Sequence, residues 1–292
     1  CCVLFSAFYS KGDRRTIHER FCQRKHLPMN WEFKSIPNVR DIGGYKMHDG
    51  RTIKHNRLLR GGFLKDASEE DILYFQKIHL RHIFDFRTEG EVSYKPDCDI
   101  PGADNLWLPT LDMHTDQKIE QFPAEAYRNL PDYLMTAAFT DKGKETARTL
   151  YPSMVVNEYT QLQYSVFIMN VLNTNEGACY WHCSEGKDRT GLGAAFLLAA
   201  LGADMDIIIE DFDKSNDYYQ ERIDIVKERI EAIGGGEEEM KVIQAFIGVS
   251  VENFINAMKL IDSEYGSMED YLHNQLLLSD DDITTLRNKY LE

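Results

Sequence analysis

The chain has 292 residues, of which 43% are hydrophobic and 28% charged, as is ordinary for a globular protein of one large or two small domains. Its formal net charge of −15 argues against nucleic-acid binding, which needs a basic face. The apolar runs are much shorter than the roughly 20 residues that a membrane-spanning helix needs, so we expect a soluble protein with no transmembrane segment.

Short strands and helices are predicted to alternate in the first part of the chain. In chain order, the predicted elements are loops and short strands over residues 28–62, a helix capped by Ser68 that ends near Ile78, a strand over 82–86, a helix that begins with the capping box Thr88–Glu91, and a strand over 105–108.

The later part of the chain is predicted to be mostly helical. The predicted elements are an irregular insertion over 110–144, a long helix over 146–172, a buried strand over 178–183, an apolar helix over 190–201 stopped by Gly202, and helices from residue 206 onward with Ser215, Ser250 and Ser279 as N-caps. This order predicts an α/β fold, a mainly parallel sheet flanked by helices with a helical C-terminal part. We expect one domain over residues 28–292, with a lid at about 110–145, and an N-terminal extension over 1–27.

The segment His182–Gly191, HCSEGKDRTG, carries the chemistry. An apolar strand delivers Cys183 to its carboxyl end, and Arg189 lies in the first turn of an apolar helix. Free backbone N–H groups at a helix N-terminus attract anions, and a short loop can aim further N–H groups at the same anion. Gly186 allows the positive φ that such a loop requires. The pattern therefore predicts a phosphate site lined by the loop residues Ser184, Glu185, Gly186 and Lys187.

Two residues of this loop have the chemistry of a phosphatase. The positive field of the loop favours the thiolate of Cys183, which can attack phosphorus and form a phosphocysteine that water hydrolyses. Arg189 offers a planar, two-pronged donor to the phosphoryl oxygens, and Thr190 could hydrogen-bond the Cys183 sulfur. The six cysteines form no paired CxxC motifs, and we expect neither a metal nor another cofactor.

The segment HCSEGKDRTG resembles the signature loop of cysteine-dependent phosphatases, and its GKDR variant resembles a bacterial tyrosine-phosphatase-like family. The resemblance extends to the segments NVRDIGGY, RLLRGGFL, FDFRTEGE, DFDKSND and YGSMEDYL, and so spans roughly residues 38–272. It implies one catalytic domain of phosphatase fold, no cofactor, and activity toward phosphotyrosine proteins and phosphoinositides. It also implies that the 110–144 insertion takes the place of a mobile lid.

Three aspartates are candidates for the general acid that protonates the leaving oxygen. Asp188 lies inside the loop, where similar phosphatases have an acidic residue, but it could instead shape the loop through backbone amides. Asp85 ends its strand on the same sheet edge as Cys183, but it could instead form an ion pair with Arg87. Asp112 follows the strand over 105–108, where many tyrosine phosphatases have an acid loop, or it is a solvated carboxylate.

Several other polar residues near these motifs are candidates for a role at the site. Lys187 is expected to point outward beside the substrate, or to be a plain surface lysine, and Arg87 is a further candidate for phosphate binding. Arg40 and Arg60 could add positive charge at the site or lie on the surface. His182 is expected to orient the loop by hydrogen bonds.

Asn216 could position water or lie at the start of a helix.

Three rival functions remain: a catalytically silent phospho-ligand-binding module, a sulfur-transfer domain, and a scaffold that uses the acidic C-terminal helices. Cys183 together with Arg189 argues against all three, and the sequence does not decide between protein and lipid substrates.

Overall fold

The computed structural model describes residues 33–111 and 130–292. The predicted N-terminal extension and half of the predicted lid therefore lie outside the described residues. The elements in chain order are β1 (Arg40–Asp41), β2 (Leu58–Gly61), α2 (Glu69–Lys77), β3 (Leu80–Asp85), α3 (Glu89–Tyr94), β4 (Asp104–Trp107), α4 (Leu130–Ala138), α5 (Asp141–Val156), α6 (Glu158–Asn173), β5 (Ala178–His182), α7 (Asp188–Leu201), α8 (Met205–Ala232), α9 (Glu237–Ile247), α10 (Val251–Tyr265), α11 (Met268–Asn274) and α12 (Asp280–Tyr290).

The strands form one sheet in the order β1-β2-β5-β3-β4. Strands β2, β5, β3 and β4 pair in parallel, and only β1 pairs antiparallel, with β2. The register places Gly61 and Asp85 on either side of His182, at the ends of β2, β3 and β5. The carboxyl ends of these three strands therefore meet at one edge of the sheet, where ligands bind in open parallel sheets.

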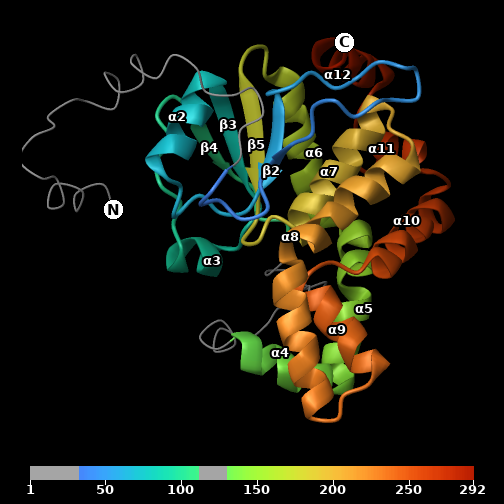
Figure 1. Cartoon of the computed structure of the whole chain (residues 1–292). Coiled ribbons are helices and arrows are strands. Elements are labelled where there is room, and N and C mark those ends of the chain that lie inside the picture. Colours follow the sequence, from blue (N-terminus) through green and yellow to red (C-terminus); the bar gives the residue numbers. More distant parts are fainter. Residues whose placement is uncertain (1–32, 112–129) are drawn as a thin grey trace, which may run out of the picture.

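Strand β5 is buried along its whole length, and its side chains alternate between the two faces of the sheet. Tyr180 packs in a cluster with Phe75 of α2, whereas Trp181 packs in the large core formed with α6 and α7. Helices cover both faces, with α2 on one side of the sheet and α6 and α7 on the other (Figure 1). The predicted α/β architecture with a mainly parallel sheet is confirmed.

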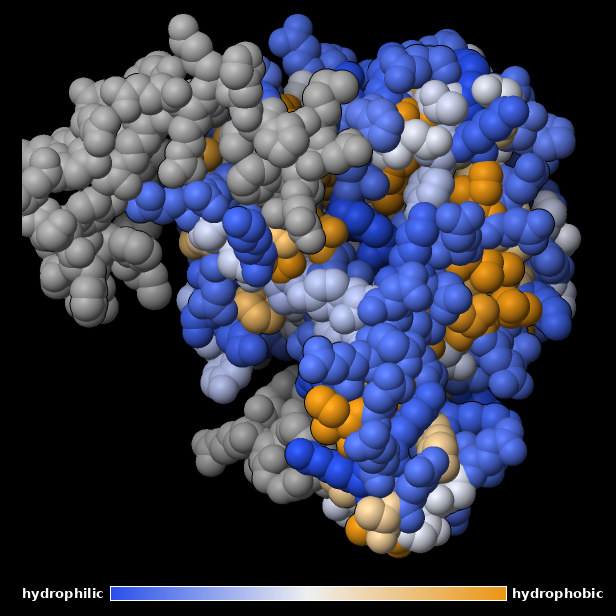
Figure 2. Space-filling view, viewed as in Figure 1, coloured by the Kyte–Doolittle hydropathy of each residue, from blue (hydrophilic) through white to orange (hydrophobic). Residues whose placement is uncertain are grey.

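A second group of helices extends from the carboxyl edge of the sheet (Figure 1). Helices α4, α5, α8 and α9 share their own core, which includes Leu134, Ala147, Ile223 and Ile243. We call this group the helical arm. The face of the molecule shown in Figure 2 is mostly hydrophilic, with small separate hydrophobic patches, in keeping with the high net charge. In the part of the chain that is described, no helix is long and apolar enough to cross a membrane.

The predicted helix caps are confirmed at Ser68, Ser250 and Ser279, whose hydroxyls each accept from a backbone N–H in the first turn. Thr88 and Glu91 form the predicted capping box. The left-handed Gly202, with a φ of 94°, ends α7 as expected.

Three predictions about the helices are wrong. The single helix over 146–172 is two helices, because Asn157 adopts an extended conformation and caps α6. Ser215 lies buried inside α8 and does not cap it. Residues 130–138 and 141–144 of the predicted irregular insertion are helical, in α4 and the start of α5.

Candidate active site

The catalytic-loop candidate runs from Cys183 to Arg189, between the end of β5 and the first turn of α7. Cys183 is almost fully buried, with 2% of its surface exposed. Gly186 has the expected positive φ, 68°, and a Cβ there would lie 2.2 Å from the Gly61 carbonyl carbon. Only glycine fits this position, because the loop turns directly against the end of β2.

The carbonyl groups of this loop are bound by residues that surround it. The Gly186 oxygen accepts from Asn38 Nδ2 at 2.8 Å and from Arg60 Nη2 at 3.1 Å. The Glu185 oxygen accepts from the Tyr219 hydroxyl at 2.8 Å, and the Ser184 oxygen from the Phe63 N–H at 3.2 Å.

In a planar trans peptide the C=O and the following N–H point in opposite directions. The N–H groups that follow these carbonyls therefore turn toward the inside of the loop. The result is a concave set of donors at a helix N-terminus, the arrangement that binds a phosphate.

Arg189 is held by Glu91 through both of its terminal nitrogens. Nη1 donates to Oε2 and Nη2 to Oε1, each at 2.7 Å, and Ser184 Oγ donates to Oε1 at 2.6 Å. Burial would raise the pKa of Glu91, but the Arg189 charge and these hydrogen bonds outweigh it and hold the pKa well below its usual range. The carboxylate is thus ionised and fixes the guanidinium beside the loop.

Sequence reasoning identified Glu91 only as part of a capping box. A signal for the second role was present, since the box follows directly after a strand that ends at the same edge as Cys183. The capping box places Glu91 one turn into α3, and the short α3 begins beside the loop.

Asp188, the favoured acid candidate, lies in the first turn of α7. Its Oδ1 accepts from the Tyr151 hydroxyl at 2.7 Å, and its Oδ2 lies 3.1 Å from Lys187 Nζ. About 20% of the Asp188 side chain is exposed, so a bound substrate could contact its carboxylate. Burial first, and then the negative charge of Asp188, raise the pKa of Tyr151 well above its usual value, so the phenol remains a donor.

Lys187 does not point outward as expected. It is buried, and its Nζ donates to the carbonyl oxygens of Phe246 and Gly248, both at 2.7 Å. These carbonyls belong to the C-terminal end of α9, where the partial negative charge of a helix attracts a cation. Lys187 therefore joins the loop to the helical arm.

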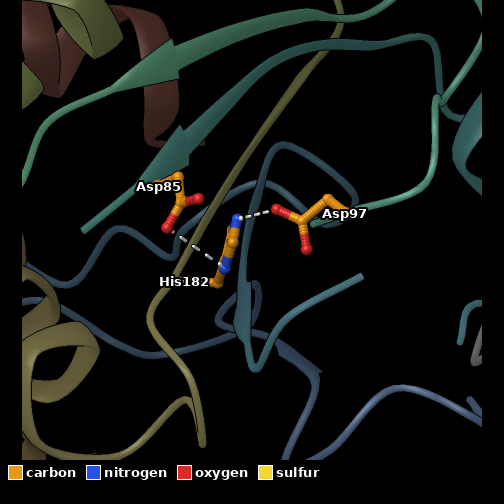
Figure 3. Close-up of side chains that lie close together, drawn as sticks. All are labelled: Asp85, Asp97 and His182. Atoms are coloured by element: carbon orange, nitrogen blue, oxygen red, sulfur yellow. Dashed lines mark ion pairs between the residues drawn. The ribbon is translucent and has the colours of Figure 1, made fainter. Parts of the chain in front are cut away.

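Asp85 and Asp97 lie on either side of His182, which ends β5 (Figure 3). His182 Nε2 is 3.2 Å from Asp97 Oδ2, and Nδ1 is 3.9 Å from Asp85 Oδ1 and 3.2 Å from the Cys183 oxygen. Burial would lower the pKa of His182, but the two carboxylates outweigh it and raise the pKa. This contact with the Cys183 carbonyl supports the expected orienting role of His182.

These three residues are the one group within the described residues that could hold a metal ion. Arg87, however, already supplies a positive charge there. Its Nη2 donates to Asp85 Oδ2 at 2.7 Å and to Asp97 Oδ2 at 2.6 Å. The arrangement is therefore explained by an ion-pair network, and the expected pair between Asp85 and Arg87 is confirmed.

Other predicted residues lie elsewhere than expected. Arg60 has no exposed surface and pairs with Asp211, so the alternative of a surface position is wrong for it. Arg40 pairs with the same carboxylate. Asn216 lies within α8 and binds the backbone of Val249, so it does not start a helix.

Thr190 Oγ1 is buried and has no hydrogen-bond partner. The hydrogen bond that it could have made to the Cys183 sulfur is therefore absent. Asp112 lies outside the described residues.

The fold and this loop define a phosphatase of the tyrosine-phosphatase-like class. A model of the tyrosine phosphatase family matches residues 31–292, and the chain belongs to this family. It is 26% identical, over 89% of its length and 87% of the relative's, to a Cupriavidus necator protein that is provisionally named a tyrosine-protein phosphatase. It is 24% identical, over 86% of its length and 93% of the relative's, to the triple specificity protein phosphatase PtpB of Mycobacterium tuberculosis.

Proposed function

We propose that residues 28–292 act as one catalytic domain that hydrolyses phosphomonoesters of phosphotyrosine proteins and phosphoinositides through a phosphocysteine intermediate. The observation that carries this proposal is the burial of Cys183 at the start of a loop whose Ser184, Glu185 and Gly186 carbonyls are bound by surrounding residues. At the other end of the loop, Arg189 is held in place by Glu91. The relative named for triple specificity supports a substrate range beyond phosphotyrosine.

The proposed reaction has two steps. The Cys183 thiolate attacks phosphorus in line with the ester oxygen, the P–O bond breaks, and Asp188 gives its proton to the leaving oxygen. Water then attacks the phosphocysteine, passes a proton to Asp188, and the P–S bond breaks to give inorganic phosphate and the thiolate. The loop N–H groups and Arg189 stabilise the charge on the phosphoryl oxygens in both steps.

The first prediction is that Cys183→Ser abolishes turnover and leaves the fold intact. A hydroxyl at this position stays protonated and is a far weaker nucleophile than a thiolate. The measurement is p-nitrophenyl phosphate hydrolysis by the purified variant, with its circular dichroism compared with that of the wild type. A variant that keeps a tenth of wild-type activity would show that Cys183 is not the nucleophile. A wild type that binds vanadate but hydrolyses nothing would favour a silent binding module.

The second prediction separates Asp188 from Asp85. Nitrophenolate leaves without a proton, whereas a tyrosyl oxygen needs one, so Asp188→Asn should slow phosphotyrosine-peptide hydrolysis far more than p-nitrophenyl phosphate hydrolysis. Asp85→Asn should slow both substrates alike, because Asp85 is bound to Arg87. Leaving-group sensitivity in Asp85→Asn alone would reverse the assignment. If each variant lost the same fraction of its rate on both substrates, Asp112 would be the next candidate for the general acid.

The balance between protein and lipid substrates is measured by comparing kcat/KM for phosphotyrosine peptides with that for each phosphoinositide. We expect turnover of both classes. Hydrolysis of peptides alone would restrict the proposed function to a protein phosphatase.

A further inference from the structure

A buried ion pair lies directly behind the catalytic loop and is made by residues that take no part in the proposed reaction. Asp211 of α8 and Arg60 of β2 are 1% and 0% exposed. Arg60 Nη1 donates to Asp211 Oδ2 at 2.5 Å. The same carboxylate accepts from Arg40 Nε at 2.9 Å and from the Tyr45 hydroxyl at 3.2 Å through Oδ1.

The other terminal nitrogen of Arg60 contacts the loop itself. Nη2 donates to the carbonyl oxygens of Gly186 at 3.1 Å and Lys187 at 3.3 Å. Each of these carbonyls shares a planar peptide with the next N–H group, which points the opposite way. Holding the two oxygens outward therefore turns the N–H groups of Lys187 and Asp188 inward, to where the phosphate is bound.

Stability alone does not account for this arrangement. A fully buried ion pair loses its hydration, and replacing such a pair with apolar residues of similar size is often neutral or stabilising. Arg60 also leaves its Nε buried without a hydrogen-bond partner. Burial and the nearby Arg40 lower the pKa of Arg60 to about 10, while Asp211 and a Cys183 thiolate favour its charged form.

We infer that Asp211 is a positioning residue of the phosphatase: it orients Arg60, which holds the Gly186 and Lys187 carbonyls away from the bound phosphate. Asn38 also binds the Gly186 oxygen, and the Gly191 N–H of α7 binds the Lys187 oxygen at 2.7 Å, so the loop does not depend on Arg60 alone. The inference rests on the phosphatase activity proposed above, because the N–H groups that Arg60 orients are those that would bind the phosphoryl oxygens.

The decisive variant is the double substitution Arg60→Met with Asp211→Leu, which removes both buried charges together. The fully buried pair is removed as a unit, and Arg40, which loses the same carboxylate, keeps the Asn38 Oδ1 and the backbone oxygen of residue 211 as acceptors. The unfolding temperature of the double variant should therefore fall only slightly. We expect its vanadate inhibition constant to rise roughly tenfold or more, and its kcat for p-nitrophenyl phosphate to fall by a similar factor, because oxyanion donors are lost. Wild-type values of both constants in this variant would overturn the inference.

A matched control separates positioning from general destabilisation. Leu286→Ala removes a fully buried side chain of α12 and should lower the unfolding temperature while leaving the vanadate inhibition constant unchanged. If the double variant does not fold, Arg60→Met alone replaces it, because Asp211 then keeps Arg40 and Tyr45 as partners. An unchanged inhibition constant in that variant would equally overturn the inference. A wild type that neither hydrolyses p-nitrophenyl phosphate nor binds vanadate would overturn the proposed function as well.

Discussion

Glu91 connects three parts of the site, because one carboxylate binds Arg189, Ser184 and the start of α3. Its two oxygens fix the plane of the guanidinium, and a planar donor must lie in the right plane to contact two phosphoryl oxygens at once. In the proposed reaction, Glu91 would therefore act through Arg189, by holding its guanidinium in one plane.

We expect Glu91→Gln to lower kcat by about 10-fold to 100-fold, because Arg189 loses its charged partner. Glutamine keeps an acceptor for the Thr88 N–H, so the capping box and α3 should persist. The measurement is kcat on phosphotyrosine peptide, with thermal unfolding followed in parallel. Glu89→Gln, in the same helical turn, is the control and should behave as wild type. A near-normal kcat in Glu91→Gln would mean that Arg189 is oriented without it.

His182 gives the molecule a pH-dependent contribution to stability. Its pKa is raised above the ordinary value of 6.5 because Asp85 and Asp97 outweigh the effect of burial. The folded state therefore binds this proton more tightly than the unfolded state does. The contribution is complete below pH 6.5 and is lost as the pH rises through the higher folded value.

Urea unfolding of wild type should accordingly show a free energy that falls as the pH rises above about 6.5. In His182→Gln the unfolding free energy should no longer show this decrease with pH. The exposed His48, which lies 3.2 Å from Asp204, provides the control, and His48→Gln should keep the wild-type slope. The same pH dependence of the unfolding free energy in wild type and His182→Gln would show that His182 is not its source.

At the scale of elements, the sequence correctly predicted the features that are determined by residues close together in the chain. The strand before Cys183, the glycine within the loop and the apolar helix after it are local patterns, and all three are confirmed. The division between α5 and α6 was missed because the apolar pattern continues across it, so periodicity alone favours one helix. Asn157 decides the division through a local hydrogen bond, its Oδ1 accepting from the Thr160 N–H at 2.9 Å.

Asn157→Ala should therefore lower the free energy of unfolding by about 1–2 kcal/mol, since the cap of α6 is lost. Asn157→Ser keeps a capping oxygen and should lose much less. Denaturant unfolding of the two variants and wild type measures the difference. Equal stabilities for the alanine and serine variants would show that the cap does not stabilise the helix pair.

At the scale of the whole molecule, sequence reasoning proposed reactive residues for the loop but did not identify the residues that hold the loop in place. Asn38 and Arg60 contact Gly186 across 148 and 126 residues of sequence, and Tyr219 contacts Glu185 across 34. No periodicity or motif spacing reports such contacts. The same limit explains the orientation of Lys187, which depends on carbonyls at the end of α9 that lie 59 and 61 residues further along the chain.

The dispersed origin of the contacts to the loop carbonyls has a consequence for folding kinetics. Helices such as α7 and α8 can form early from local contacts, whereas the contacts of Asn38, Arg60 and Tyr219 with the loop close long stretches of chain and form late. After dilution from denaturant, helical circular dichroism should therefore recover before the ability to bind vanadate. Enzymatic competence in this molecule marks the completion of folding and not the formation of its secondary structure.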